Sequence, residues 1–463
     1  EKSSSFIKEK FKNRAYPDFP CHTHLVIHSS RGGIRLQIHV VRQNETLFSI
    51  AREYNVSENA IETANQLPNP DRLVVGQAIV IPISGSFYTV RSGDSLWSIS
   101  RRFGLSPEEL ARVNGISVNT ILSVGMRLYI PPTRKRNAEF NGYIEPFGTT
   151  ISPDLESSAR EAAPYLTYLS PFSFRARRDG TLDEPPLGNL PAIASQNRNI
   201  LVMVITNQEQ GRFSAELGHI LLNDQQIQNR FFNNITAIAN RYRFRDIHFD
   251  FEYLRPEDRE AYNQFLRRAK ERFSRQGWFL STALAPKTSA GQKGRWYEGH
   301  DYKAHGEIVD FVVIMTYEWG YSGGPPMPVS PIGPVRQVLQ YAVTEIPSQK
   351  ILMGQNLYGY DWTLPFVPGR DTARAISPQE AIRLAVRYNA VIHYDEQAQA
   401  PYIDYTDEQN RRHKVWFEDA RSIQAKFNLL KQLNLRGMSY WKLGLSFPQN
   451  WLLLADNFNP VKK

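Results

Sequence analysis

Cysteine is almost absent from this sequence, in which Cys21 is the single thiol. A lone cysteine excludes an intrachain disulfide and a cysteine-based metal cluster, so we expect no metal and no other cofactor. No apolar run approaches the roughly 20 residues that a membrane-spanning helix needs. The opening "EKSSSFIKEKFKNRAYPDFP" also lacks the apolar segment of a secretory signal. These absences argue against a disulfide-rich secreted domain and against an integral membrane protein.

Positive charge is in excess, since lysine and arginine outnumber aspartate and glutamate and leave a formal net charge of +9. A basic balance suits polyanions such as nucleic acid, anionic lipid or an acidic cell-wall polymer. The sequence has no basic helix with interleaved aromatic residues, so we expect no nucleic-acid partner. With 463 residues, 41 % of them hydrophobic and 22 % charged, the chain is globular and long enough for two or three domains.

The front of the chain contains one unit twice, at His39–Ile83 and at Tyr88–Pro132. Each copy opens with a β-rich run, after which Thr46 or Ser95 precedes an apolar pattern of helical period. A second capped helical pattern follows, and a glycine turn leads to the last β-run. The repeat therefore predicts two small strand–helix–helix–strand domains.

These two units resemble LysM domains along their whole length. The resemblance implies binding of N-acetylglucosamine-containing glycans, either peptidoglycan or chitin, in a groove between the loop after the first strand and the loop before the last. Carried over, it places the glycan-binding residues of the second unit at Gly93, Asp94, Ser95, Leu96, Asn119, Thr120 and Ile121, and those of the first at Asn44, Glu45, Thr46, Leu47, Arg72 and Leu73. The first unit has no glycine at the position of Gly93, so we expect its groove to differ. Two tandem copies favour avidity for a repeating polymer over a purely structural role.

Residues ahead of His39 fit no element of the repeat. The run "SSRGG" followed by Leu36 leads us to hypothesise that residues 1–35 are translated upstream sequence and that the natural chain starts at position 36, while a real leader is the alternative. The predicted domains are a leader at 1–36, LysM units at 37–84 and 87–133, a linker at 134–138, and a third domain at 139–463 with an insertion at 364–415.

From residue 139 onward, eight apolar β-type runs alternate with helical patterns. The alternation predicts an α/β fold whose parallel strands close into a (β/α)8 TIM barrel. A doubly wound sheet is the alternative, but no glycine-rich phosphate loop follows the first β-run. Chemistry in such barrels sits at the C-terminal ends of the strands. The polar residues that fall there are Asp250, Glu252, Tyr317, Glu318, Tyr358, Asp361 and Trp441.

The fourth β-run, "RDIHFDFEYL" at Arg245–Leu254, places two carboxylates inside an apolar stretch. Side chains alternate along a strand, so His248, Asp250 and Glu252 share one face. The run resembles the D-x-D-x-E catalytic motif of family 18 glycoside hydrolases, and "MTYEW", "LYGYDW" and "GMSYW" resemble the marks of the family's sixth, seventh and eighth strands. Four motifs in the family's order make the resemblance specific, and it covers residues 139 to about 458.

The resemblance implies retaining, substrate-assisted hydrolysis, in which the 2-acetamido group of the substrate forms an oxazolinium intermediate. It makes Glu252 the general acid and later the base, while Asp250 orients the acetamide and Tyr317 hydrogen-bonds its oxygen. Trp441 is the expected floor beneath the sugar. Further candidates for substrate contacts are His248, Tyr358, Asp361 and Glu318, of which the two acids fit ordinary loop positions equally well.

The sequence departs from the family motif at His248, where the family has another aspartate. In the family that aspartate shares a hydrogen bond or a proton with its neighbour. We therefore expect a different proton relay here, in which His248 donates to Asp250 and keeps it ionised.

The stretch between the seventh and eighth β-runs, residues 364–415, is long for a barrel connection. It contains a capped helical pattern, "SPQEAIRLAVRYN", and a β-hairpin pattern with a turn near Asp395–Gln399. It resembles the small α+β insertion that walls one side of the substrate cleft in some family members, which implies a deep cleft.

Two LysM units ahead of a family 18 barrel resemble the layout of spore-associated peptidoglycan N-acetylglucosaminidases. The resemblance implies cleavage of N-acetylglucosaminyl bonds in cortex peptidoglycan during germination, by a protein associated with the spore or the cell wall. A chitinase or endo-β-N-acetylglucosaminidase acting on another glycan is one alternative, and a non-catalytic glycan-binding coat protein is another. The exact glycan and the oligomeric state stay open.

Overall fold

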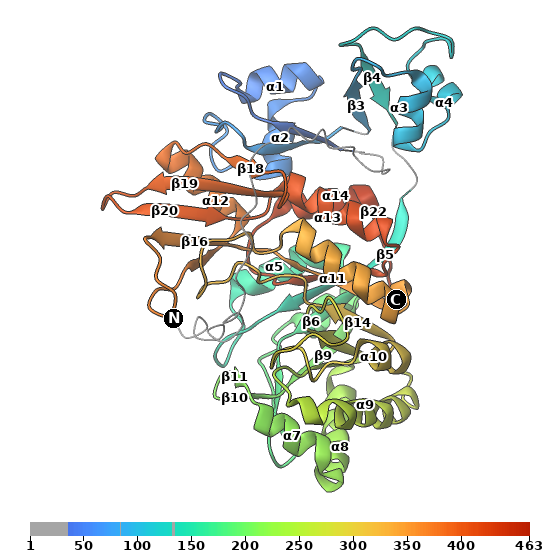
Figure 1. Ribbon diagram of the computed structural model, residues 1–463, viewed down its shortest axis with the longest axis vertical. Helices are drawn as coiled ribbons and strands as arrows, with labels where there is room; N and C mark the ends of the chain where they lie inside the picture. Colours follow the sequence, from blue (N-terminus) through green and yellow to red (C-terminus); the bar gives the residue numbers. More distant parts are fainter. Residues whose placement is uncertain (1–35, 84, 132–134) are drawn as a thin grey trace.

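The computed structural model describes residues 36–83, 85–131 and 135–463, so the hypothesis about residues 1–35 lies outside the described part. Figure 1 shows the two repeat units at the top, a sheet-containing insertion below them and a barrel that fills the rest of the molecule. Within the described ranges, no helix is both long and apolar enough to span a membrane.

Each repeat unit forms a strand–helix–helix–strand domain in which the two strands pair antiparallel. The first consists of β1 (Gln37–Val40), α1 (Leu47–Tyr54), α2 (Glu58–Asn65) and β2 (Ala78–Ile81), and the second of β3 (Ser86–Thr89), α3 (Leu96–Phe103), α4 (Pro107–Val113) and β4 (Arg127–Ile130). Thr46 and Ser95 cap α1 and α3 through capping boxes. Because each box satisfies two otherwise unpaired backbone N–H groups, it fixes where the helix begins.

Eight parallel strands close into a barrel, which confirms the predicted fold class. In chain order they are β5 (Arg136–Ile144), β6 (Tyr168–Pro171), β9 (Ile200–Thr206), β12 (Asp246–Asp250), β13 (Phe279–Leu284), β14 (Phe311–Ile314), β15 (Ile351–Asn356) and β21 (Gly437–Trp441). Each strand pairs with the next, and β21 returns to β5. β5 begins at Arg136, inside the expected linker 134–138, because its first residues pair with β22 (Phe458–Pro460).

Helices surround the barrel and cover the apolar outer face of its strands. They are α5 (Pro153–Ala162), α6 (Leu190–Gln196), α7 (Ala215–Asn223), α8 (Gln225–Tyr242), α9 (Arg259–Ser274), α10 (Tyr302–Ile308), α11 (Ile332–Glu345), α13 (Ala420–Gln432) and α14 (Pro448–Asn457). On β12, for example, the ring of Phe249 lies 6.4 Å from Phe231 of α8 and 4.9 Å from Phe265 of α9. Such outward burial leaves the alternate side chains of β12 pointing into the barrel.

Short elements decorate the two ends of the barrel strands. The strands are β7 (Phe174–Ala176), β8 (Leu182–Asp183), β10 (Gln208–Glu209) and β11 (Arg212–Phe213), and short 3-10 turns lie at Ala163–Tyr165, Pro256–Asp258 and Ser348–Lys350. β7 continues the line of β6 and pairs with the end of β9, so it extends the barrel wall at the C-terminal end of these strands.

The insertion is a five-stranded antiparallel sheet packed against one helix, α12 (Pro378–Tyr388). Its strands are β16 (Gly359–Leu364), β17 (Arg374–Ile376), β18 (His393–Asp395), β19 (Ala400–Thr406) and β20 (Arg412–Trp416). The predicted hairpin forms between β18 and β19. The insertion starts before the expected residue 364, because "GYDWTL" pairs with β20 as β16 instead of extending barrel strand β15.

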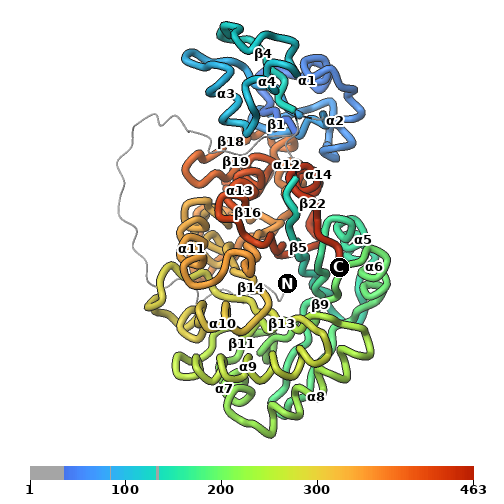
Figure 2. The backbone as a smooth tube through the Cα atoms, turned by 90° about the vertical axis from the view of Figure 1, so that its right-hand side faces the viewer, coloured from blue at the N-terminus to red at the C-terminus, as the bar shows by residue number. Residues whose placement is uncertain are grey.

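The first LysM unit is docked onto the barrel and the insertion. Gln449 of α14 donates from Nε2 to Oδ1 of Asn65 and to the carbonyl of Ala78, both at 2.8 Å. The loop before β2 lies on the insertion, where Val74 is buried in the apolar core and Val75 accepts a backbone hydrogen bond from Ile392. The second unit sits farther out and contacts the first, as Figure 2 shows from the side.

Candidate active site

β12 presents its polar side chains at one end of the barrel. Asp246, His248 and Asp250 point inward from the strand, and Glu252 follows just after its C-terminal end. Both motif carboxylates are buried, with Asp250 5 % and Glu252 6 % exposed. The strand period thus brings the two acids to the same side, as the sequence predicts.

Glu252 is held by side chains from two neighbouring barrel loops. Nε1 of Trp296, in the loop after β13, donates to Oε2 of Glu252. Asn207, which directly follows β9, accepts from the Glu252 backbone N–H at 3.0 Å and donates to its carbonyl at 2.9 Å. The backbone and the carboxyl group of the acid therefore have fixed positions before any substrate arrives.

Tyr317 lies in the loop after β14 and is 8 % exposed. A Cβ on Gly354 of β15 would lie 2.9 Å from the Tyr317 ring, so glycine at that position allows the ring to approach the strand. Burial raises the pKa of Tyr317 well above its usual value, and Tyr143, Asp250 and Glu252 add to the increase. The hydroxyl stays protonated at neutral pH and is available as a hydrogen-bond donor.

Trp441, the last residue of β21, is partly buried. Its ring stands edge-on to Tyr143 at 5.5 Å and to Phe172 at 4.8 Å. These two rings, from β5 and from the residue after β6, hold the indole at the barrel mouth.

His248 has other hydrogen-bond partners than the expected Asp250. Its Nε2 lies 2.8 Å from the hydroxyl of Tyr143 and its Nδ1 lies 2.8 Å from Oγ of Ser281. Ser281 in turn donates to both carboxylate oxygens of Asp246 at 3.0 Å. The expected donation to Asp250 is therefore wrong, because side chains from β5 and β13 occupy both ring nitrogens.

A buried hydrogen-bond network inside the barrel connects Asp246, Ser281, His248 and Tyr143. Burial lowers the pKa of His248 to about 3, so the imidazole is neutral at physiological pH. The Ser281 hydroxyl donates its hydrogen bond to Asp246, so Ser281 Oγ accepts from Nδ1–H of His248. Nε2 of His248 therefore accepts a hydrogen bond from the Tyr143 hydroxyl. Burial also raises the pKa of Asp246 to about 7. The position of the missing family aspartate is thus occupied by a neutral, doubly hydrogen-bonded ring.

Glu318 and Tyr358 lie together beside Tyr317. The hydroxyl groups of Tyr358 and Tyr360 both donate to Oε1 of Glu318, the second at 3.0 Å. Glu318 has a positive φ of 68°, a strained conformation for a residue with a Cβ. Tyr317, Tyr358 and Tyr360 belong to one buried cluster with Trp296, and Trp441 packs against it. The predicted contacts Glu318 and Tyr358 therefore share a wall with the catalytic candidates.

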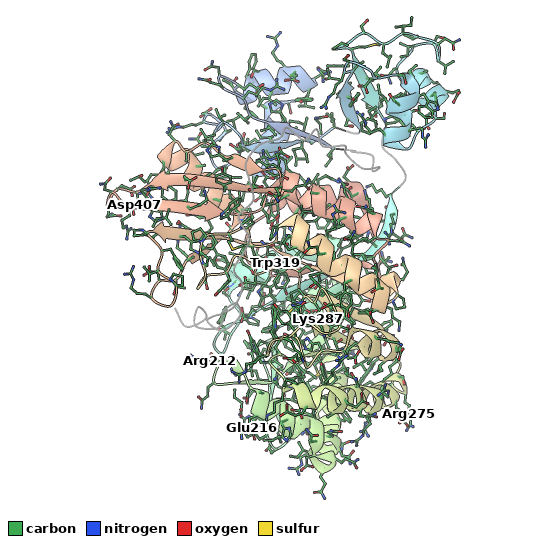
Figure 3. All side chains as sticks on the ribbon, in the orientation of Figure 1. Arg212, Glu216, Arg275, Lys287, Trp319 and Asp407 are labelled. Atoms are coloured by element: carbon green, nitrogen blue, oxygen red, sulfur yellow. The ribbon has the colours of Figure 1, made fainter. Side chains whose placement is uncertain are left out.

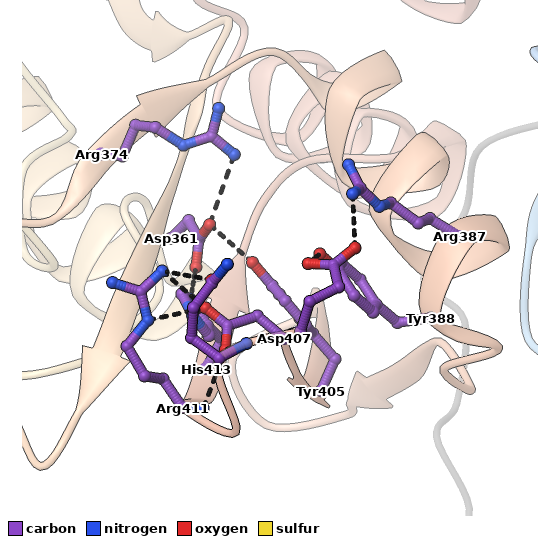
Figure 4. Close-up of polar contacts among 10 residues, drawn as sticks. Asp361, Arg374, Arg387, Tyr388, Tyr405, Asp407, Arg411 and His413 are labelled. Carbon is purple, nitrogen blue, oxygen red and sulfur yellow. Dashed lines mark hydrogen bonds and ion pairs between the residues drawn. The ribbon is translucent and has the colours of Figure 1, made fainter.

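Asp361 lies elsewhere, in the sheet of the insertion. Figure 4 shows its carboxylate between three partners: Nδ1 of His413 at 2.8 Å, the hydroxyl of Tyr405 at 2.9 Å and Nη2 of Arg374 at 3.4 Å. All three belong to the insertion. The contacts of Asp361 thus lie inside the insertion, because the pleat turns its side chain away from those of Tyr360 and Trp362.

The predicted LysM residues divide into loop-shaping and exposed ones. Asp94 accepts from the Arg91 backbone and the Tyr88 hydroxyl, and Glu45 makes equivalent contacts with Arg42 and His39. Leu47 and Leu96 are buried in the domain cores, whereas Gly93, Asn119 and Ile121 are exposed, Ile121 at 93 %. Asn44 has a φ of 66°, close to the 82° of Gly93, so an asparagine in the left-handed region replaces the missing glycine.

Several functional neighbours were missed by the sequence reasoning. Trp296 lies in an irregular loop, "KGRWYEGHD", in which no periodic pattern marks it. Asn207 follows an all-apolar strand and also gives no signal. Tyr143 was within reach, because it occupies an inward position near the end of the first β-run, two residues after Asn141. In the part of the chain that the structure describes, no group of three or more His, Cys, Asp or Glu side chains could hold a metal ion.

Comparisons with known proteins agree with this arrangement. The family model described as glycosyl hydrolases family 18 matches residues 161–445, and the LysM domain model matches residues 39–82 and 88–131. The chain is 68 % identical over 428 residues to a cortical fragment-lytic enzyme of Bacillus subtilis (strain 168), which covers 92 % of this chain and 99 % of that protein.

Solved structures give the same relationship. The crystal structure of the spore cortex-lytic enzyme SleL from Bacillus megaterium QM B1551 is 56 % identical with a TM-score of 0.86, covering 93 % of this chain and 100 % of that one. The SleL structure from Bacillus cereus is 51 % identical with a TM-score of 0.85, covering 93 % and 99 %. The likeness extends over the LysM units, the insertion and the barrel.

Proposed function

The chain belongs to family 18 of the glycosyl hydrolases and carries two LysM domains, and from this premise we propose that it hydrolyses N-acetylglucosaminyl bonds of spore cortex peptidoglycan. The observation that carries the proposal is the buried Asp250–Glu252 pair at the barrel mouth, in a chain 68 % identical to a cortical fragment-lytic enzyme. Cortical fragment-lytic enzymes match nearly the whole chain, which supports the same substrate here.

The proposed reaction begins with proton transfer from Glu252 to the leaving glycosidic oxygen. The substrate's own acetamide oxygen attacks the anomeric carbon from the opposite face, and the bond to the leaving sugar breaks. Asp250 accepts a hydrogen bond from the acetamide N–H and stabilises the resulting oxazolinium ion. Glu252, now ionised, takes a proton from water, which opens the oxazolinium and restores the original configuration.

The remaining side chains position the reacting sugar. Tyr317 donates to the acetamide oxygen, for which its raised pKa keeps it protonated. Trp441 provides an aromatic face beneath the ring. Trp296 and Asn207 hold Glu252 in place, since both hydrogen-bond it. Preorganisation of this kind lowers the barrier because the acid need not be oriented during the reaction.

The LysM units hold the enzyme on an insoluble polymer that contains N-acetylglucosamine. Their presence supports an association with the cell wall, and the SleL relatives support the spore cortex as the site of action. Binding through a separate domain raises the local concentration of glycan at the barrel mouth.

The test is product analysis by mass spectrometry with the protein and its Glu252→Gln variant. We expect cortex peptidoglycan to yield fragments that end in reducing N-acetylglucosamine, and we expect the variant to bind the glycan and release none. Turnover by the variant would remove Glu252 from the acid role. Release from chitin oligomers alone would reassign the enzyme to chitin.

A further inference from the structure

An open pocket of 710 Å³ lies next to the catalytic strand, between the short strands that decorate β6 and β9. Its walls come from β7, β8, β10 and β11, at the side of the barrel mouth where Glu252 is held. Figure 3 labels Arg212 on its rim, with the side chain extending away from the barrel. None of the roles derived above for the active site uses this pocket.

Arginine dominates the lining. The pocket contains Arg175, Arg177, Arg178 and Arg212 but only two carboxylates, Asp183 and Glu209. Arg177 forms an ion pair with Asp183. Arg178 binds Glu209 in a bidentate ion pair, with Nε 2.7 Å from Oε1 and Nη2 3.0 Å from Oε2. Arg175 and Arg212 are both exposed, and across residues 36–83, 85–131 and 135–463 no carboxylate pairs with either. Two guanidinium groups are therefore available to an anionic ligand.

Hydrogen bonds connect the pocket to the catalytic acid. Asn207, which binds the Glu252 backbone, also donates to the carbonyl of Ser214 in the pocket wall at 3.0 Å. The ring of Phe213 lies 6.4 Å from that of Tyr253, the residue after Glu252. Ser214 donates to Glu209 at 2.7 Å, which fixes the wall that carries Arg178. The wall of the pocket is thus in contact with the segment that carries Glu252 and Tyr253.

We propose that this pocket binds the carboxylates of the peptide that branches from the glycan strand in peptidoglycan. The inference rests on the proposed function, because it assigns the pocket to another part of the same substrate. A planar guanidinium matches a carboxylate in two parallel hydrogen bonds, and Arg175 and Arg212 supply two such groups. An unsubstituted N-acetylglucosamine polymer has no carboxylate, so the pocket separates peptide-bearing glycan from chitin.

The experiment compares Arg175→Gln/Arg212→Gln with Arg245→Gln as the matched control. Arg245 is an exposed arginine directly before the N-terminal end of β12, and its side chain makes no hydrogen bond or ion pair within the part of the chain that the structure describes. Soluble cortex fragments are prepared with intact peptides and, in parallel, with the peptides removed enzymatically. We expect the double variant to lose about tenfold or more in kcat/KM on peptide-bearing fragments, mainly through KM, with little change on peptide-free glycan.

Binding is measured separately in a Glu252→Gln background, which removes dependence on turnover. A selective loss of affinity for peptide-bearing fragments supports the proposal, while an equal loss on both fragments, or no loss, overturns it. Failure of the unsubstituted protein to cleave any cortex glycan would instead contradict the proposed function, and the binding comparison still decides the role of the pocket.

Discussion

At the scale of single residues, the site combines two buried acids with a neutral ring. Glu252 is fixed through Trp296 and Asn207, and the inward row of β12 continues below it through Asp250 to His248. A charged histidine at that depth would need a counter-charge, because burying an ion without one is costly. Its neutral form instead fits a hydrogen bond on each ring nitrogen.

The neutral state of His248 predicts how stability depends on pH. In the unfolded chain the imidazole titrates near its ordinary pKa of 6.5, whereas burial lowers its pKa in the folded state to about 3. Between these values the unfolded state binds the additional proton, so the free energy of unfolding falls as pH decreases below about 6.5. The slope contributed by His248 approaches about 1.4 kcal/mol per pH unit.

His248→Gln removes this titration and keeps an uncharged side chain with one hydrogen-bond donor group and one acceptor group. We expect the stability difference, unsubstituted protein minus variant, to decrease steadily from pH 7 to pH 4. Chemical unfolding at several pH values measures it. The difference is needed because Asp246, whose pKa is raised to about 7, titrates in both proteins. Between about pH 4 and pH 7 the folded state keeps a proton on Asp246 that the unfolded state loses, so Asp246 increases stability as the pH decreases, opposite to His248. Taking the difference between the two proteins removes this contribution. A difference that is constant with pH would show that His248 is charged in the folded state.

At the scale of elements, the first LysM unit behaves as part of the barrel body. The glycine turns of the two units have nearly the same backbone, with φ of 84° at Gly76 and 89° at Gly125. Their surroundings differ, since a Cβ on Gly76 would lie 1.8 Å from the carbonyl oxygen of Ile392, whereas nothing lies within 4 Å of one on Gly125. An alanine at Gly125 therefore meets only backbone strain, whereas an alanine at Gly76 meets the same strain and also a clash with the docked insertion.

We expect Gly125→Ala to lower the free energy of unfolding by about 1–2 kcal/mol, which is the cost of a left-handed alanine. Gly76→Ala should cost clearly more, because its methyl group also forces the turn away from the insertion. Thermal and denaturant unfolding of both variants gives the comparison. Equal losses would mean that the contact between Gly76 and Ile392 does not persist in solution.

The elements also show what a sequence can predict. All eight barrel strands follow from apolar runs, because burial on both faces leaves a strong signal. The capped helices of the LysM units follow from Thr46 and Ser95, because a cap residue acts on the backbone of the helix directly after it. β16 was missed as a separate element because "GYDWTL" continues the apolar run of β15 without a break, and the change of sheet depends on pairing with distant β20. For that reason Asp361 was expected at the end of a barrel strand, whereas it lies in β16. Trp296 was missed because loops have no periodic pattern.

At the scale of the whole molecule, the two LysM units have different surroundings. In the first, the loop that would form one wall of the groove lies on the insertion, with Arg72 donating to Asn389 at 3.3 Å and Val74 buried. In the second, the corresponding loop is open to solvent, with Ile121 93 % and Val124 71 % exposed. Figure 2 places this second unit at the end of the molecule away from the barrel. We therefore expect the second unit to provide most of the adhesion to the polymer.

Ile121→Asp tests this division of labour. The substitution puts a charge on the exposed apolar wall of the second groove, so retention on insoluble cortex peptidoglycan in a sedimentation assay should fall about tenfold or more. Turnover of short soluble fragments should stay unchanged, because they reach the barrel without being tethered. Val367→Asp is the matched control, since Val367 is a 40 % exposed apolar residue of the insertion. Unchanged retention of Ile121→Asp would assign adhesion to the first unit or to the barrel cleft. A parallel loss of turnover on soluble fragments would mean that the second unit also presents the glycan to Glu252.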